Sequence, residues 1–256
     1  LGWKAVFWLF GVIGVLLGVL WFKFVPDNPK QSPYVNEAEL EHINDGRENT
    51  VEAKEIAPWG KLLKSSQFWS LGLQFMITDY IMYVFLAWLP LYLMEVHGFS
   101  LSKMGLWAAA PWLSLMAVVS CCGYLSDKAI AAGFSQNLVK TSTGAVGILL
   151  CACTLFIATR TADPMMNVFW LSVALGSLGL TMSASWSSVI SMGGRFAGSV
   201  SGWMNFWGNI GGVLAPSVTA WVATTYGWQA ALAVTAVSGI AGAVLWLFVK
   251  PDKAIV

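Results

Sequence analysis

One acidic residue interrupts a long apolar segment of the sequence. Asp79 lies within QFMITDYIMYVFLAWLP, where most of its neighbours are apolar or aromatic. A carboxylate inside a bilayer is energetically expensive, so such a residue indicates a function by default. Tyr80 and Tyr83 follow on or beside the same side of a helix. We expect Asp79 to couple an ion or substrate, or to line a hydrated cavity or gate. The tyrosines either contact a substrate or pack between helices.

Two amides recur at helical spacing in a second apolar segment. Asn205 and Asn209, four residues apart in SGWMNFWGNIGGVLAPSVTAW, lie on one face of a helix. An amide in hydrocarbon needs a hydrogen-bonding partner. Flanking glycines, including Gly208-x-x-x-Gly212, allow close helix packing. The amides therefore contact a substrate or hold helices together. Pro216, further along, is a candidate kink and gate hinge.

A single large ring lies among small residues in a third apolar segment. Trp186 is surrounded by serine and alanine in LTMSASWSSVI, and Ser183 and Ser187 fall on the same side of a helix. A lone tryptophan within a membrane span usually packs against other helices. The small neighbours also leave space in which the ring face could stack on a ligand, with Ser183 supplying a hydroxyl.

The sequence lacks the patterns that enzymes and metal sites require. Its two histidines, His42 and His97, fall in predicted loops, and no HExxH, GxSxG or P-loop pattern is present. The four cysteines lie inside apolar segments and have no zinc-site or CxxC spacing. We expect neither an enzyme nor a cofactor nor a bound metal.

The composition predicts a polytopic α-helical membrane protein. Of 256 residues, 57% are hydrophobic and 11% are charged, whereas soluble domains carry about 25% charged residues. The formal net charge of +1 gives no reason to expect a nucleic-acid partner. Segments of about 20 apolar residues are long enough to span a bilayer. Seven such segments are predicted: 6–24, 68–93, 104–125, 141–159, 168–192, 203–223 and 230–249.

The positive residues predict how these spans are oriented. If the segment after the first span is cytoplasmic, eleven lysines and arginines fall on the cytoplasmic side and three on the other. The chain then begins outside and ends inside, so its first and last spans run in the same direction.

The two ends of the chain resemble each other. LGWKAVFWLFGVIGVLLGVLWFKFVPD (1–27) aligns without a gap to YGWQAALAVTAVSGIAGAVLWLFVKPD (226–252), with nine identities in 27 positions. Similarly oriented copies six helices apart are typical of a six-plus-six duplication. We therefore expect residues 1–24 to be the last helix of an amino-terminal bundle. A cytoplasmic linker (25–67), a six-helix carboxyl-terminal bundle (68–249) and a cytoplasmic tail (250–256) follow. On this interpretation five helices precede the chain.

The linker is predicted to contain a short helix. Asn36 followed by Glu39 matches a capping box, and Leu40 and Ile43 give the helix an apolar side. We expect Gly46 to end this helix.

Several motifs resemble one transporter family. They are GWKAVFWLFGVIGVL followed by a proline-rich linker with NEAELEHI, then YIMYVFLAWLPLYLMEVHGFSLSKMGLWAAAP, GYLSDK and SGWMNFWGNIGGVLAPSVTAW. Together they resemble the major facilitator superfamily, and within it the anion:cation symporter branch of galactonate, hexuronate, glucarate and phthalate transporters. The resemblance covers helices six to twelve. It implies an all-α transporter in the bacterial inner membrane that carries a small organic anion with a proton by alternating access.

The resemblance also implies roles for individual residues. It aligns Asn205 with a substrate-contacting amide, and it places Trp186 in the substrate cavity. Asp127, in GYLSDK, would help close the cytoplasmic gate, against Arg195 or against the amino end of the sixth span. Family members often carry an amide at the position of Asp79. The sequence has no lysine or arginine at mid-membrane depth, so the cation that pairs with the substrate is expected in the amino-terminal bundle.

Two alternatives remain from the sequence. The same fold also suits a facilitator or exporter of neutral solutes. The chain could also be an inactive fragment, or a half-transporter that pairs with another half.

Overall fold

The computed structural model describes residues 2–26, 29–44 and 56–255, and within these ranges all regular structure is helical. The chain divides into two compact units, 1–56 and 57–256. The prediction of an all-α fold is confirmed.

The described residues of the first unit form three helices. They are α1 (Trp3–Phe24), the 3-10 turn η1 (Pro29–Gln31) and α2 (Glu37–Asn44). No residue of α1 is buried, although the helix is apolar on all sides. Such a surface suits contact with lipid or with other helices. The backbone N–H of Glu39 donates to Asn36 Oδ1 at 2.8 Å, which confirms the predicted cap of α2. Gly46 lies outside the described residues.

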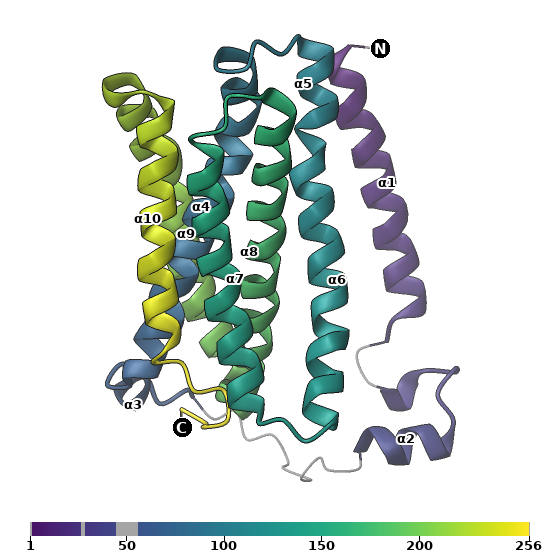
Figure 1. The fold of residues 1–256 in the computed structure, drawn as a ribbon. Helices are drawn as coiled ribbons and strands as arrows, with labels where there is room; N and C mark the ends of the chain where they lie inside the picture. Colours follow the sequence, from purple (N-terminus) through teal and green to yellow (C-terminus); the bar gives the residue numbers. More distant parts are fainter. Residues whose placement is uncertain (1, 27–28, 45–55, 256) are drawn as a thin grey trace. The chain divides into compact units, whose positions relative to one another are not determined.

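The second unit is a bundle of long helices (Figure 1). Its elements are α3 (Trp59–Leu62), α4 (Ser66–Glu95), α5 (Leu101–Trp107), α6 (Ala109–Ala131), α7 (Gln136–Ala158), α8 (Pro164–Gly193), η2 (Gly194–Phe196), α9 (Ala197–Tyr226) and α10 (Trp228–Trp246).

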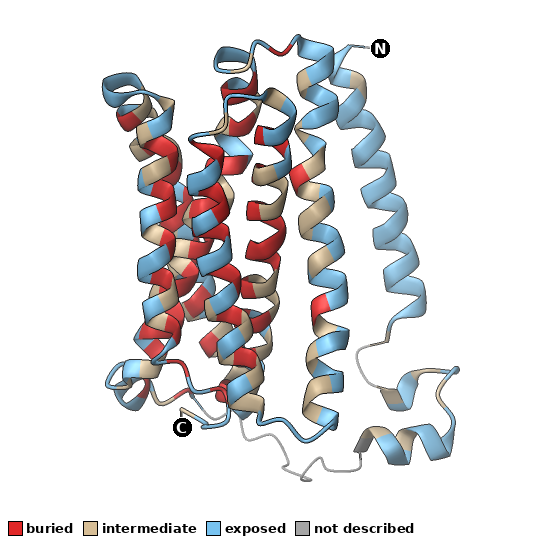
Figure 2. Ribbon diagram, viewed as in Figure 1, coloured by how far each residue is buried: buried red, intermediate tan, exposed pale blue. Residues whose placement is uncertain are grey.

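The core of this unit lies between α4, α7, α8, α9 and α10. Figure 2 shows their facing sides as buried, whereas α6 is mostly exposed or half-buried. The exposed apolar side chains of α6, among them Leu113 and Met116, form a surface suited to hydrocarbon.

Six segments of the described residues are long and apolar enough to cross a membrane. The longest, Pro164–Tyr226, has 63 residues and contains both α8 and α9. A span needs about 20 residues, and η2, which begins at Gly194 with φ +48°, separates these two 30-residue helices. Two of the spans predicted from the sequence, 168–192 and 203–223, therefore fall in separate helices of this segment.

Short polar caps and glycines set where the helices begin and end. Ser135 Oγ accepts from the Leu138 N–H at the start of α7, and Asp163 Oδ1 accepts from the Met166 N–H at the start of α8. After α4, Gly98 adopts φ +63° and its N–H donates to the Met94 carbonyl, which is an αL-type helix end.

Candidate substrate and coupling site

The closest approach of α4 and α9 is made at glycines. A β-carbon at Gly208 would meet the Asp79 carboxylate and the Phe75 ring, and one at Gly211 would meet the Met76 carbonyl. One at Gly212 would lie 3.0 Å from the Tyr83 ring. The glycines of α9 therefore let α4 pack backbone to backbone. This packing places Asp79 and Tyr83 directly against α9.

Asp79 is buried, and one of its carboxylate oxygens has no polar partner in the part of the chain that the structure describes. Its side chain is 7% exposed, and Oδ1 accepts no hydrogen bond from the described residues. No basic side chain in the described ranges pairs with it. A buried, unpaired carboxylate is costly unless its charge is removed or compensated. Binding of a proton or a cation would remove this cost, which is the chemistry that a coupling residue needs.

The Phe75 ring of α4 packs against Trp186 of α8, on the side of α4 where Asp79 lies. The Trp186 and Phe75 rings meet edge-on, with centroids 5.9 Å apart and planes at 85°. The Phe75 ring also lies against Gly208 of α9. Trp186 itself is 41% exposed, so one part of its ring is free to contact a ligand. Phe75 was not identified from the sequence, although it lies one helical turn before Asp79.

The two amides of α9 face outward from the bundle. Asn205 and Asn209 are both exposed, and Asn209 Nδ2 donates to the Asn205 carbonyl of its own helix at 2.8 Å. Within the described residues neither side chain bonds to another helix. The geometry therefore gives no support, inside this unit, for the alternative that the amides hold helices together.

The other predicted contacts lie around these residues. Tyr80, Tyr83 and Ser183 are half-buried. The Tyr80 backbone nitrogen lies close to Gly211, so this turn of α4 is held against α9. Substrate contact by these side chains remains a prediction.

A buried polar network lies next to the site and links three helices. Gln74 Nε2 of α4 donates to Ser185 Oγ of α8 at 3.1 Å, and Thr181 Oγ1 of α8 donates to the Gly144 carbonyl of α7 at 3.0 Å. Thr78, beside Asp79, donates to the Gln74 carbonyl at 2.9 Å. These polar residues are fully buried. The network fixes the turns that carry Asp79 and Trp186 relative to each other.

Two of the predicted gate residues lie near helix ends, Asp127 in the last turns of α6 and Arg195 in η2, between α8 and α9. Asp127 is exposed and interacts electrostatically with Lys140 of α7. The Arg195 guanidinium lies 5.0 Å from the centre of the Phe196 ring. Pro216 lies inside α9, which continues on both sides of it. Gating by these residues remains a prediction.

Lys140 is a buried cation that lies one residue before the predicted span 141–159. It is 8% exposed, and its Nζ donates to the Ser187 carbonyl and to Ser191 Oγ, both at 3.2 Å. The α7 helix begins at Gln136, four residues earlier, so Lys140 packs against the last turns of α8. The sequence signal was available in NLVKTSTGAVG, where the lysine directly precedes the hydroxyl residues that open the predicted span 141–159.

The comparison with known families decides the class of the chain. Residues 1–216 match the Major Facilitator Superfamily. The chain belongs to this superfamily. Its assignment to a transporter family rather than an enzyme family is confirmed, as is its resemblance to sugar-acid transporters.

Similar proteins include three transporters from different organisms. The chain is 27% identical over 253 residues to an ascorbate transporter of Arabidopsis thaliana chloroplasts, covering 98% of the chain and 47% of that protein. It is 28% identical to a D-galactonate transporter of Escherichia coli (98% and 60%) and 29% identical to a probable galactarate/D-glucarate transporter of Bacillus subtilis (100% and 58%). The chain thus spans about half the length of these relatives.

A solved structure supports the same fold. A bacterial homologue of the human drug peptide transporters matches with a TM-score of 0.56 at 16% identity, covering 73% of the chain and 44% of that protein. This likeness supports the predicted helix-bundle fold, and the superfamily itself rests on the family match.

Proposed function

We propose that the protein containing this chain is a secondary active transporter that carries a small organic anion, such as a sugar acid, together with a proton. The observation that carries this proposal is the superfamily match combined with relatives named as galactonate, glucarate and ascorbate transporters. Transport would proceed by alternating access between two bundles. The membrane would be the bacterial inner membrane, with the carboxyl terminus in the cytoplasm.

In this proposal the chain supplies one wall of the substrate cavity. Trp186 stacks on the C–H face of the substrate, while Asn205 and Asn209 bind its hydroxyls. Tyr80, Tyr83 and Ser183 complete this wall. Support comes from the exposure of Trp186 and the amides on α8 and α9, beside a helix interface that contains Asp79.

Asp79 is proposed to take part in coupling. Because Oδ1 is buried without a hydrogen-bond partner among the described residues, binding a proton would lower the cost of burying the carboxylate. The α1 helix is proposed to be the last helix of the amino-terminal bundle, and residues 68–249 the carboxyl-terminal bundle. The cation that pairs with the substrate anion would come from the amino-terminal bundle.

One observation favours the alternative of a neutral solute. Among the described residues, no lysine or arginine side chain contacts Asp79, Trp186 or Asn205, and the buried Lys140 is bound to α8. A facilitator of neutral solutes would need no such cation.

Uptake by the native full-length protein in liposomes separates these functions. We expect D-galactonate or D-glucarate to accumulate when the outside is acidified, and a protonophore to abolish this accumulation. Accumulation of D-galactose that is independent of the proton gradient, with no uptake of either acid, would show a neutral-solute carrier instead.

A further inference from the structure

A second group of polar side chains lies at the carboxyl-terminal end of α4, away from Asp79. The Asn167 Nδ2 group of α8 donates to Tyr92 Oη of α4 at 3.0 Å and to the Ala158 carbonyl of α7 at 2.8 Å. Tyr92 Oη in turn lies 3.3 Å from His97 Nε2. Tyr92 is 5% exposed and Asn167 is fully buried. Asn167 therefore joins α4, α7 and α8, and His97 lies at the α4 end of this chain of hydrogen bonds.

The direction of these hydrogen bonds depends on the protonation of His97. Because Tyr92 Oη already accepts from Asn167, its own proton is available to the neutral His97 Nε2. A protonated His97 carries a donor at Nε2, so two donors then face the Tyr92 oxygen and the Tyr92 proton loses its acceptor. Asn167 Oδ1 is buried without a partner among the described residues. Protonation therefore requires this group of side chains to rearrange.

The charged groups around His97 come from each neighbouring element. From the cap of α8, the Asp163 carboxylate acts on the imidazole. From α4, Glu95 is already engaged, since it accepts from Trp228 Nε1 at 2.8 Å. From α5, Lys103 Nζ lies 4.4 Å from the centre of the Phe99 ring, which contacts His97. At the end of α7, Arg160 lies over Phe156.

Burial dominates the ionisation of His97. It lowers the pKa of His97 below the ordinary value of 6.5, although Asn167 and the Asp163 carboxylate act in the opposite direction. The unfolded chain then binds the proton more readily than the folded chain. The stability contributed by neutral His97 is complete above pH 6.5 and is lost as the pH falls through the lower folded value.

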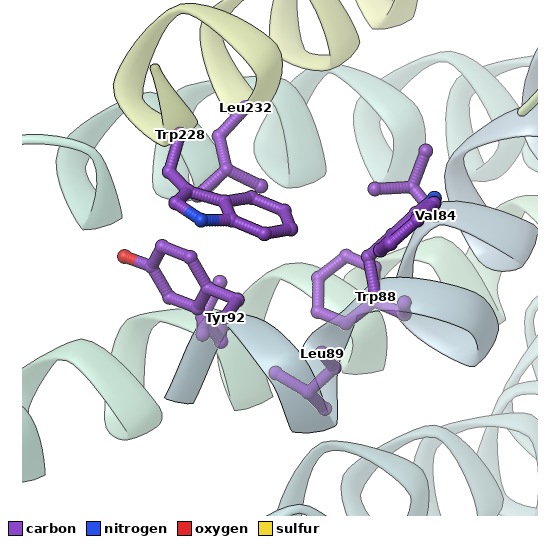
Figure 3. Close-up of a pocket in the computed structure, with 8 residues that line it drawn as sticks. Val84, Trp88, Leu89, Tyr92, Trp228 and Leu232 are labelled. Atoms are coloured by element: carbon purple, nitrogen blue, oxygen red, sulfur yellow. The ribbon is translucent and has the colours of Figure 1, made fainter. Parts of the chain in front are cut away.

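The segment of α4 beyond Pro90 follows a proline and lies beside a small cavity. Pro90 lies inside α4 and lacks the N–H that would bond to the preceding turn. A small apolar cavity of about 20 Å³ lies next to this segment, lined by Trp88, Leu89, Tyr92 and Trp228 among others (Figure 3). In Figure 3 the Tyr92 ring lies beside the Trp228 indole, and its hydroxyl points away from Trp88. The end of α4 thus has a proline, adjacent space and a polar attachment to α8 through Tyr92, besides the bond of Glu95 to Trp228 of α10.

We propose that His97 is a proton-binding site whose protonation releases the end of α4 beyond Pro90 from α8. By the predicted orientation this end faces the outside, so the site senses external pH. The inference rests on the cluster itself and does not depend on which solute is carried.

The first test measures proton binding directly. In the native full-length protein in nanodiscs, ¹⁵N-histidine spectra assign His97 by the signal lost in His97→Gln, with His42→Gln removing the other histidine of the chain. We expect a titration midpoint below 6.5. Tyr92→Phe removes the O–H that neutral Nε2 accepts, so it should raise that midpoint. A midpoint at or above 6.5, or one that Tyr92→Phe leaves unchanged, overturns the proposal.

The second test measures release of the helix end. Leu93 is fully buried on the segment beyond Pro90, whereas Leu91 on the same turn is 37% exposed. We expect the alkylation rate of Leu93→Cys, divided by that of Leu91→Cys, to rise severalfold as the pH falls through the His97 midpoint. The rise should be absent in His97→Gln, whose amide oxygen still accepts from Tyr92. A rise that persists in His97→Gln contradicts the proposal. Neither test requires transport, so both give an answer even if the proposed function fails.

Discussion

Alanine substitutions along α9 test whether its glycines set the distance to α4. A β-carbon at Gly208 would lie 2.8 and 2.9 Å from two carbons of the Phe75 ring and would also meet the Asp79 carboxylate. Because carbon atoms pack at about 3.5 Å, the ring must move by about 0.7 Å. Both neighbours are side-chain ends that can shift, so we expect a loss of about 1–3 kcal/mol, typical of overpacking.

Two other glycines of α9 provide a more destabilising substitution, Gly211→Ala, and a matched control, Gly202→Ala. At Gly211 the β-carbon would meet the Met76 carbonyl of the backbone, which cannot turn aside. Gly211→Ala must therefore separate the helices and should cost about 3 kcal/mol or more. At Gly202 no atom lies within 4 Å, so Gly202→Ala should be neutral or stabilising by up to about 1 kcal/mol.

Thermal unfolding in detergent measures the order of stability of these three variants. With the exposed Cys121 and Cys153 replaced by serine, labelling of the buried Cys151 by a thiol-reactive dye reports unfolding. A change of 1 kcal/mol shifts the melting temperature by about 2–4 °C for a domain of this size, so Gly208→Ala should melt several degrees below the parent and Gly211→Ala lower still. If Gly211→Ala melts as high as Gly202→Ala, the close packing of α4 on α9 is wrong.

Three further substitutions test the proposed site. Asp79→Asn should abolish the dependence of uptake on the proton gradient, because the amide cannot exchange a proton; unchanged uptake and pH dependence would remove Asp79 from the mechanism. Trp186→Ala should raise KM about tenfold, equivalent to about 1.4 kcal/mol, whereas Trp186→Phe keeps a stacking ring and should lose less; equal KM values for parent and alanine variants would exclude substrate contact. Asp127→Ala should lower the transport rate more than it weakens binding in an equilibrium assay, since it removes a charge that acts on Lys140; an unchanged rate would count against a gate.

The sequence predicted the helices well because their signal is local. Apolar length and caps such as Asn36 lie within one segment, and they do not depend on what the helix packs against. The four-residue spacing of Asn205 and Asn209 also predicted that they share one face of a helix, and both are exposed on α9. What the sequence left open, for the amides, was whether an exposed face meets a ligand or another helix.

Other features depend on packing between distant segments. Phe75 is an ordinary apolar residue until Gly208 and Trp186 are brought to it from two other helices. Lys140 resembles an interface lysine until the end of α8 covers it and supplies oxygens. The bond between Gln74 and Ser185 joins residues 111 positions apart, so no local pattern could reveal it.

Protection of a cysteine by substrate tests most directly whether the face formed by α4, α8 and α9 binds the transported anion. Ser183→Cys is a small change on the helix that carries Trp186, and the exposed Cys153 of α7 serves as an internal reference. The account predicts that D-galactonate or D-glucarate slows alkylation of Cys at position 183 in the full-length protein, while D-galactose does not, and that Cys153 reacts equally in every case. Alkylation at position 183 that is unaffected by a saturating, transported acid would contradict it.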